Sequence, residues 1–117
     1  MKKITSNAIN AFMNNNKFSE SNTRVALVPD EKLKRLKVEL YLFDNLIAYK
    51  CIDEIEGTTN HYISSAGWST STTRERLNGL LTNLGGGRVF IKDLTMYYED
   101  SVGMINLLDS PYFTQVR

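Results

Sequence analysis

The sequence predicts an α+β domain in which an antiparallel sheet of about five or six strands is packed by an N-terminal helix and a central helix. Short segments alternate between apolar and polar residues and are joined by short turns, a pattern typical of antiparallel strands. Two other segments repeat apolar residues at helical spacing and need a sheet face to cover. Of the 117 residues, we expect 1–100 to form one domain. Residues 101–117 are expected to be a C-terminal extension, either a short helix or a docked tail.

The first helix is expected from Thr5 to about Asn15. Thr5 or Ser6 is a suitable N-cap, because a hydroxyl accepts a hydrogen bond from a free amide of the first turn. The asparagines at 14–16 are expected to end the helix, since Asn has low helix propensity and tolerates the left-handed conformation. The apolar side of this helix is formed by Ile4, Ala8, Ile9, Ala11, Phe12 and Met13.

Four strands are expected next, at about 21–28, 37–43, 46–52 and 61–65. Pro29-Asp30 should end the first, because proline cannot donate a hydrogen bond to a neighbouring strand. The charged residues 30–37 are expected to form a loop or turn. Asp44-Asn45 is a plausible hairpin turn, since both residue types tolerate positive φ.

A central helix over about 72–84 is the most strongly indicated element. Thr72 and Glu75 have the spacing of a capping box, and Gly85 has the position of a C-terminal cap. Gly79 inside the helix costs about 1 kcal/mol relative to alanine, which suggests close approach of a strand there. The apolar stripe of this helix is formed by Leu77, Leu80, Leu81 and Leu84.

The end of the chain is expected to form a hairpin and a short helix. Residues 89–92 and 95–99 alternate as strands, with a turn at Lys92-Asp93 or Asp93-Leu94. Ser101 is a suitable cap for a short helix, and Pro111 should stop it. The apolar residues of this helix would be Val102, Ile105, Leu107 and Leu108.

The segment Ser65-Ala66-Gly67-Trp68, just before the central helix, holds the single tryptophan of the chain. We expect Gly67 to turn the chain from strand to helix and Trp68 to fill the edge of the core beneath that turn. Burial of the Trp68 ring therefore decides whether the segment is a signature of the fold or a binding site.

Composition argues against several classes of function. The 14 basic and 13 acidic residues give a net charge of +1, whereas nucleic-acid binders usually carry a clear basic excess. One cysteine and one histidine provide neither a disulfide nor a cysteine-rich zinc site. Gly85–Gly87 follows a helix, whereas a phosphate-binding loop precedes one. We therefore expect no enzyme activity, cofactor or metal, and no membrane span or signal peptide.

The expected function is binding, and two kinds of residue are candidates for it. Basic residues, above all those of segment 32–37, would bind nucleic acid if aromatic rings lay beside them for bases to stack on. Aromatic residues near the end of the chain are candidates for a protein interface, because tyrosine and tryptophan are enriched at binding hot spots. The candidates are Lys32, Lys34, Arg35, Lys37, Trp68, Arg74, Arg76, Tyr97, Tyr98, Tyr112 and Phe113.

The chain resembles a family of small bacteriophage proteins over about residues 4–98. The resemblance lies in Ser21-Asn22-Thr23, in Ala66-Gly67-Trp68 and above all in Thr72-Thr-Arg-Glu-Arg-Leu-Asn-Gly-Leu80. The chain departs from the family pattern at residues 97–100, in the tail from residue 101 and in the charged segment 30–37.

The resemblance carries no catalytic residues. It implies an accessory protein that binds and modulates a host protein or complex in the cytoplasm of the infected bacterium, such as an anti-CRISPR-like inhibitor of host defence. A nucleic-acid-binding module and a structural component of the virion are the alternatives, and a homodimer is a further option.

Overall fold

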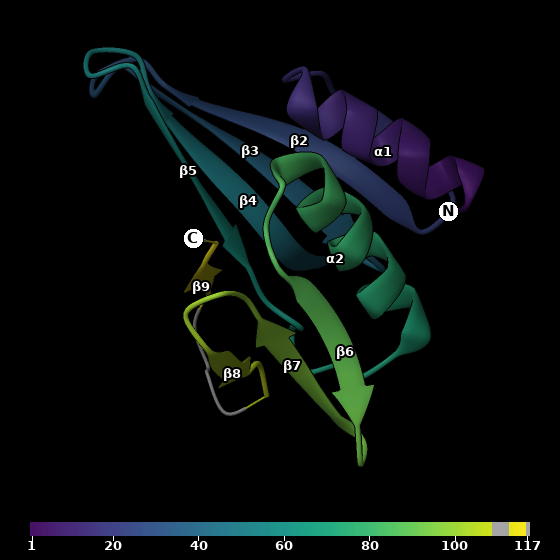
Figure 1. Ribbon diagram of the computed structural model, residues 1–117. Coiled ribbons are helices and arrows are strands. Elements are labelled where there is room, and N and C mark those ends of the chain that lie inside the picture. The colour runs from purple at the N-terminus through teal and green to yellow at the C-terminus, as the bar shows by residue number, and fades with distance from the viewer. Residues whose placement is uncertain (109–112, 117) are drawn as a thin grey trace.

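The computed structural model describes residues 1–108 and 113–116, which form two helices and nine strands in two sheets (Figure 1). The α+β class expected from the sequence is confirmed. The elements are α1 (Lys3–Met13), β1 (Phe18–Glu20), β2 (Thr23–Asp30), β3 (Arg35–Leu42), β4 (Asn45–Asp53), β5 (Thr58–Ile63), α2 (Ser71–Leu84), β6 (Arg88–Lys92), β7 (Thr95–Glu99), β8 (Met104–Asn106) and β9 (Thr114–Gln115).

The larger sheet has six antiparallel strands in the order β1-β2-β3-β4-β5-β9, and a separate sheet has the order β6-β7-β8. Both helices lie on one face of the larger sheet (Figure 1). We call this the inner face. Its residues Val25, Leu40, Ala48 and Ile63 are cross-strand neighbours, and each is at most 2% exposed. The small sheet and α2 complete the same core through Leu77, Leu80, Leu81, Val89, Met96 and Tyr98.

The predicted helix near the C-terminus is wrong. Residues 104–106 form β8, which pairs with β7. The Asp100 carboxylate accepts hydrogen bonds from the amides of Val102 and Gly103, and the Asp100 amide donates to the Gly103 carbonyl. This turn reverses the chain so that it continues along β7. Further on, β9 pairs with β5, so the C-terminal segment adds one strand to each sheet. Pro111, the expected stop of the helix, lies outside the described residues.

The strand boundaries differ from expectation around the charged segment. Pro29 does not end β2, which runs to Asp30 at the part of the sheet edge that β1 leaves unpaired. The expected loop shrinks to residues 31–34, because Arg35 and Lys37 belong to β3. The β3–β4 turn is Phe43-Asp44, one residue earlier than predicted, with φ of 50° and 61°. The turn at Asp93-Leu94 is one of the two predicted positions.

Helix α2 follows the predicted stripe of leucines, but its start differs from the prediction. The N-cap is Thr70, whose hydroxyl accepts a hydrogen bond from the Thr73 amide at 3.2 Å. Gly85 ends the helix in the left-handed conformation, as predicted. A β-carbon at Gly79 would lie 2.8 Å from Cγ2 of Thr5. The glycine therefore permits close packing of α1, and not of a strand as expected.

Arg76 corrects a second prediction for α2, because it is buried, with 2% exposure, instead of forming part of a binding surface. Its guanidinium donates to Oγ1 of Thr5 at 2.6 Å and to Oγ1 of Thr23 at 3.2 Å, and it pairs with the Glu75 carboxylate. The Thr5 hydroxyl donates to the same carboxylate. Burial raises the pKa of Glu75, but hydrogen bonds from Thr5, the Lys2 amide and Arg76 bring it below its usual value. One buried arginine thus joins α1, α2 and β2.

Candidate functional site

An apolar pocket of about 260 Å³ opens between the β3–β4 turn and the start of α2. Its lining comes from two segments that are distant in sequence, 42–47 and 68–73. We call it the aromatic pocket, after the two exposed rings of Phe43 and Trp68, which are 66% and 55% exposed. A concave apolar site with a few polar groups is the usual form of a binding site. The lining residues are Leu42, Phe43, Asn45, Ile47, Trp68, Thr70, Thr72 and Thr73.

Trp68 is held at the pocket by a hydrogen-bonded turn, and the prediction that it fills the core is wrong. Ala66 and Gly67 have φ of 54° and 84°. The Ala66 amide donates to Oγ of Ser64, the Gly67 amide donates to Oγ of Ser65, and the Trp68 amide donates to the Ser65 carbonyl. Ser65 fills the core position instead, with no exposed surface. The turn leaves the following indole at the surface.

Phe43 is exposed because it occupies the first position of the β3–β4 turn. Its positive φ is unusual for a residue with a bulky side chain. The Phe43 amide donates to the Asn22 carbonyl at 2.8 Å, and its carbonyl accepts from the Asn45 side chain at 3.2 Å. The backbone on both sides of the ring is therefore fixed. The sequence pattern placed Phe43 in a strand, because the turn was expected one residue later, at Asp44-Asn45. The actual turn at Phe43-Asp44 moves Phe43 out of the strand.

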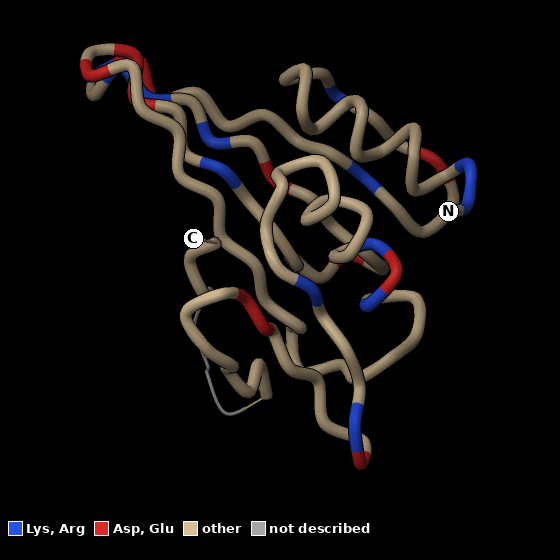
Figure 2. Tube along the Cα trace, in the orientation of Figure 1, with Lys and Arg blue, Asp and Glu red and all other residues tan. Residues whose placement is uncertain are grey.

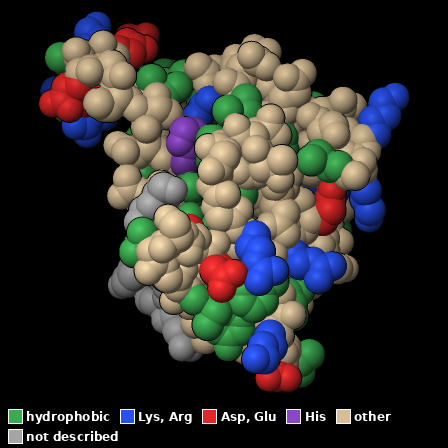
Figure 3. Space-filling model, in the orientation of Figure 1, with side chains coloured by type: hydrophobic (Ala, Val, Ile, Leu, Met, Phe, Trp, Pro, Cys, Tyr) green, Lys and Arg blue, Asp and Glu red, His purple; other side chains and the backbone are tan. Residues whose placement is uncertain are grey.

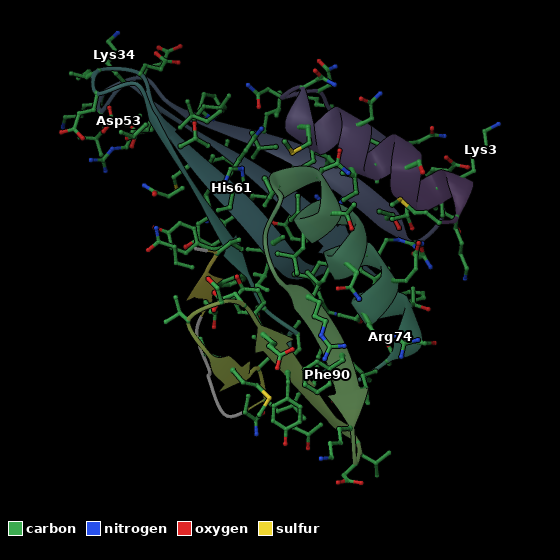
Figure 4. All side chains as sticks on the ribbon, in the orientation of Figure 1. Lys3, Lys34, Asp53, His61, Arg74 and Phe90 are labelled. Atoms are coloured by element: carbon green, nitrogen blue, oxygen red, sulfur yellow. The ribbon has the colours of Figure 1, made fainter. Side chains whose placement is uncertain are left out.

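The lining of the pocket contains no ionisable residue. Its polar groups are the side chains of Asn45 and three threonines, and the indole N–H of Trp68. Two of these hydroxyls, those of Thr70 and Thr73, already bond to each other at 2.9 Å. The pocket therefore has the chemistry to hold an apolar group and lacks a side chain that could transfer a proton at neutral pH. Arg74, a predicted site residue, is exposed on the first turn of α2 beside the pocket segment (Figure 4).

The predicted basic cluster lies at the far end of β3 from the pocket, at the tip where Lys34 is labelled (Figure 4). Acidic residues are mixed with the basic ones there (Figure 2). Arg35 lies 3.6 Å from the Asp53 carboxylate, and Lys37 lies 3.3 Å from that of Glu39. Lys32 and Lys34 are exposed at the same tip. Because carboxylates accompany these cations, the fold forms no purely basic patch at this tip and brings none of them to Trp68.

The aromatic candidates near the C-terminus lie at different places. Tyr98 is fully buried, so its inclusion in a binding surface is wrong. Tyr97 faces outward on the small sheet and stacks on Phe90 with ring centroids 5.4 Å apart. Figure 3 shows an apolar patch over this part of the molecule, bordered by both basic and acidic side chains. Phe113 packs edge-on against Tyr49 at 5.0 Å. Tyr112 lies outside the described residues.

The single histidine and the single cysteine point to opposite faces of the larger sheet. Lys50 and His61 are neighbours on the inner face. Burial and then the Lys50 charge lower the pKa of His61, and burial lowers the pKa of Lys50. Cys51 follows Lys50 in β4, so its side chain points to the opposite face. Within residues 1–108 and 113–116 no group of three or more His, Cys, Asp or Glu is placed to hold a metal ion.

Neither described helix is long and apolar enough to cross a membrane. The chain matches no curated protein and no solved structure. A model of one family, described as Kyanoviridae Gp96 protein, matches residues 1–116. This match agrees with the expectation of a phage protein, and the chain belongs to the Kyanoviridae Gp96 family of cyanophage proteins.

Proposed function

We propose that the protein is a non-enzymatic phage accessory protein that binds a host protein or protein complex through the aromatic pocket and so modulates its activity. A host defence complex is one target of this kind. The observation that carries the proposal is the exposure of Phe43 and Trp68 at a preformed apolar pocket. The partner is expected to insert a bulky apolar side chain between the two rings.

The energetics favour this site as an anchor. A large aromatic side chain has about 150–250 Å² to bury. Covering the exposed half of each ring would contribute roughly 2–3 kcal/mol at about 25 cal/mol per Å². The backbone around both rings is already fixed by hydrogen bonds. Binding therefore costs little ordering of these segments, and preorganisation of this kind raises affinity.

A protein suits the pocket better than a nucleic acid does. Most of the affinity of a protein for nucleic acid comes from cations that contact phosphates. The pocket lining contains no cation, and the basic residues at the other end of β3 lie among carboxylates. The lack of ionisable groups in the lining also supports binding without catalysis.

The test is an affinity pull-down from a lysate of the cyanobacterial host. The bait is the protein or its Phe43→Ala/Trp68→Ala variant. Leu94→Ala is the matched control, because Leu94 is an apolar residue that is 87% exposed at a different turn. We expect the protein and the control to capture the same partner at a constant ratio and the double variant to capture at least about tenfold less. Equal capture by all three baits would refute the proposed site, and no capture by the unaltered protein would refute the function.

A further inference from the structure

The second face of the six-stranded sheet, which we call the outer face, is covered by neither helix (Figure 1). Cross-strand pairing assigns its residues, because partners in register point to the same side of a sheet. Arg24 pairs with Tyr41, Glu39 with Tyr49, and Tyr49 with Tyr62. Apart from Glu39, which is 9% exposed, these side chains are half-buried. Phe113, beside β9, packs edge-on against Tyr49 on this face. In the part of the chain that the structure describes, no helix covers these tyrosines, and they remain partly exposed.

The outer face has a charged half and an aromatic half. On β2 and β3, the Arg24 guanidinium lies 4.0 Å from the centre of the Tyr41 ring, and the Tyr41 hydroxyl donates to Glu39 at 3.0 Å. On β4 and β5, Tyr49 stacks on Tyr62 with centroids 4.8 Å apart. The Lys37 ammonium, 4.4 Å from the Tyr49 ring, lies at the boundary between the halves. The two halves differ in chemistry and can attract each other through cation–π contacts.

The balance of charge on the outer face indicates which kind of molecule can bind there. Each cation has a carboxylate within reach, since Arg24 lies 3.5 Å from Asp44 and Lys37 lies 3.3 Å from Glu39. Such a balanced face has no excess charge to attract a polyanion. It also does not repel a second face of the same composition.

A two-fold axis parallel to the strands makes the face complementary to itself. Such an axis places β2 of one copy opposite β5 of the other, so the half that carries Arg24 covers the half that carries Tyr62. Two sheets pack in this way about 10 Å apart, with their strands roughly aligned. A symmetric dimer buries the same patch on both copies.

We propose that the outer face binds a second copy of the same chain and that the protein is a face-to-face homodimer. The arginine of each copy lies against the tyrosines of the other. The lining of the aromatic pocket includes none of these outer-face residues, although Phe43 also lines a hollow with Arg24 and Asp44. The inference therefore does not depend on the proposed function.

The position of the single cysteine provides a direct test. Cys51 pairs with Lys37 and Asn60 across the sheet, so it lies on the outer face of a central strand and close to the proposed axis. Treatment of the unaltered protein with a short bis-maleimide should give one covalent dimer. Sedimentation of the untreated protein should give twice the mass of the chain.

Two charge-changing variants test the interface, and a third serves as control. Tyr62→Glu and Arg24→Glu should each weaken the dimer at least about tenfold, as measured by sedimentation, and reduce the cross-linked product. Far-UV circular dichroism identifies any variant that fails to fold. Trp68→Glu, at the aromatic pocket, should leave the dimer unchanged while it abolishes capture of the host partner. A monomer at high micromolar concentration would overturn the proposal, as would a dimer that survives both charge-changing variants.

Discussion

Replacement of Arg76 by methionine tests how the two helices are attached to the sheet. The variant keeps an apolar side chain of similar length but removes the guanidinium. Two well-formed hydrogen bonds, to Thr5 and Thr23, are lost together with the ion pair to Glu75. A hydrogen bond to a charged group contributes about 1.5–3 kcal/mol. Removal of one partner of a buried pair costs about 3–5 kcal/mol.

The expected loss is about 3 kcal/mol, at the lower end of that range. The Glu75 side chain is 25% exposed, so water can replace part of its lost partner. Methionine also fills some of the volume that arginine leaves. This loss is a large fraction of the roughly 5–15 kcal/mol that stabilises a typical domain.

The assay is equilibrium urea unfolding followed by far-UV circular dichroism, because the exposed Trp68 is a poor reporter of core packing. Arg74→Met is the matched control on the same helix, and its exposed side chain predicts a change within about 0.5 kcal/mol. Glu75→Gln combined with Arg76→Met should cost less than the sum of the two single changes, since the partners are coupled. If Arg76→Met and Arg74→Met differed by less than about 1 kcal/mol, the network would not have the role assigned to it.

Three further predictions concern packing, pH and nucleic acid. Gly79→Ala should destabilise the protein by about 1–3 kcal/mol in thermal unfolding, despite the higher helix propensity of alanine, because the new β-carbon would lie 2.8 Å from Thr5. Gly103→Ala is the control, since the space around Gly103 is open. Equal effects of the two variants would argue against the close contact between the helices. Stability should fall as the pH drops below about 6.5, because the pKa of His61 is lowered by burial and by Lys50, so the unfolded chain takes up a proton that the folded protein does not. The slope is at most about 1.4 kcal/mol per pH unit, and His61→Gln should flatten it above about pH 5 in the same assay; an unchanged slope would assign the pH dependence to other groups. In a low-salt gel-shift assay neither duplex nor single-stranded nucleic acid should be retained, and clear retention would reopen the nucleic-acid alternative.

Local sequence patterns predicted the elements whose stability depends on near neighbours. The leucine stripe of α2 and its cap at Gly85 follow from spacing within a single helix. The turn at Asp93-Leu94 follows from two alternating segments joined by two residues. In each case the residues that decide the structure lie within a few positions of each other, so the pattern contains the information.

Predictions failed where distant residues decide the environment. Arg76 lies four residues before Leu80 and hence on the buried side of α2, but its burial requires Thr5 and Thr23 from other elements. Residues 104–106 extend the small sheet because β7 offers a free edge, which no local pattern reveals.

The candidate site was only partly predictable for the same reason. Trp68 was identified, but its exposure depends on Ser65 taking the core position. Phe43 became part of the site through a turn one residue earlier than its composition suggests. The pocket exists because the β3–β4 turn and the segment before α2 meet in space.

A photo-crosslinking amino acid placed at position 43 tests whether the aromatic pocket binds the host partner. The protein is expressed in the cyanobacterial host and irradiated, with the same photoreactive residue at position 94 as control. We expect one covalent adduct with a host protein from position 43, reduced strongly by Trp68→Ala and absent from position 94. Adducts of equal yield from both positions, or none at position 43 while the unaltered protein still captures its partner, would contradict the assignment of the aromatic pocket as the binding site.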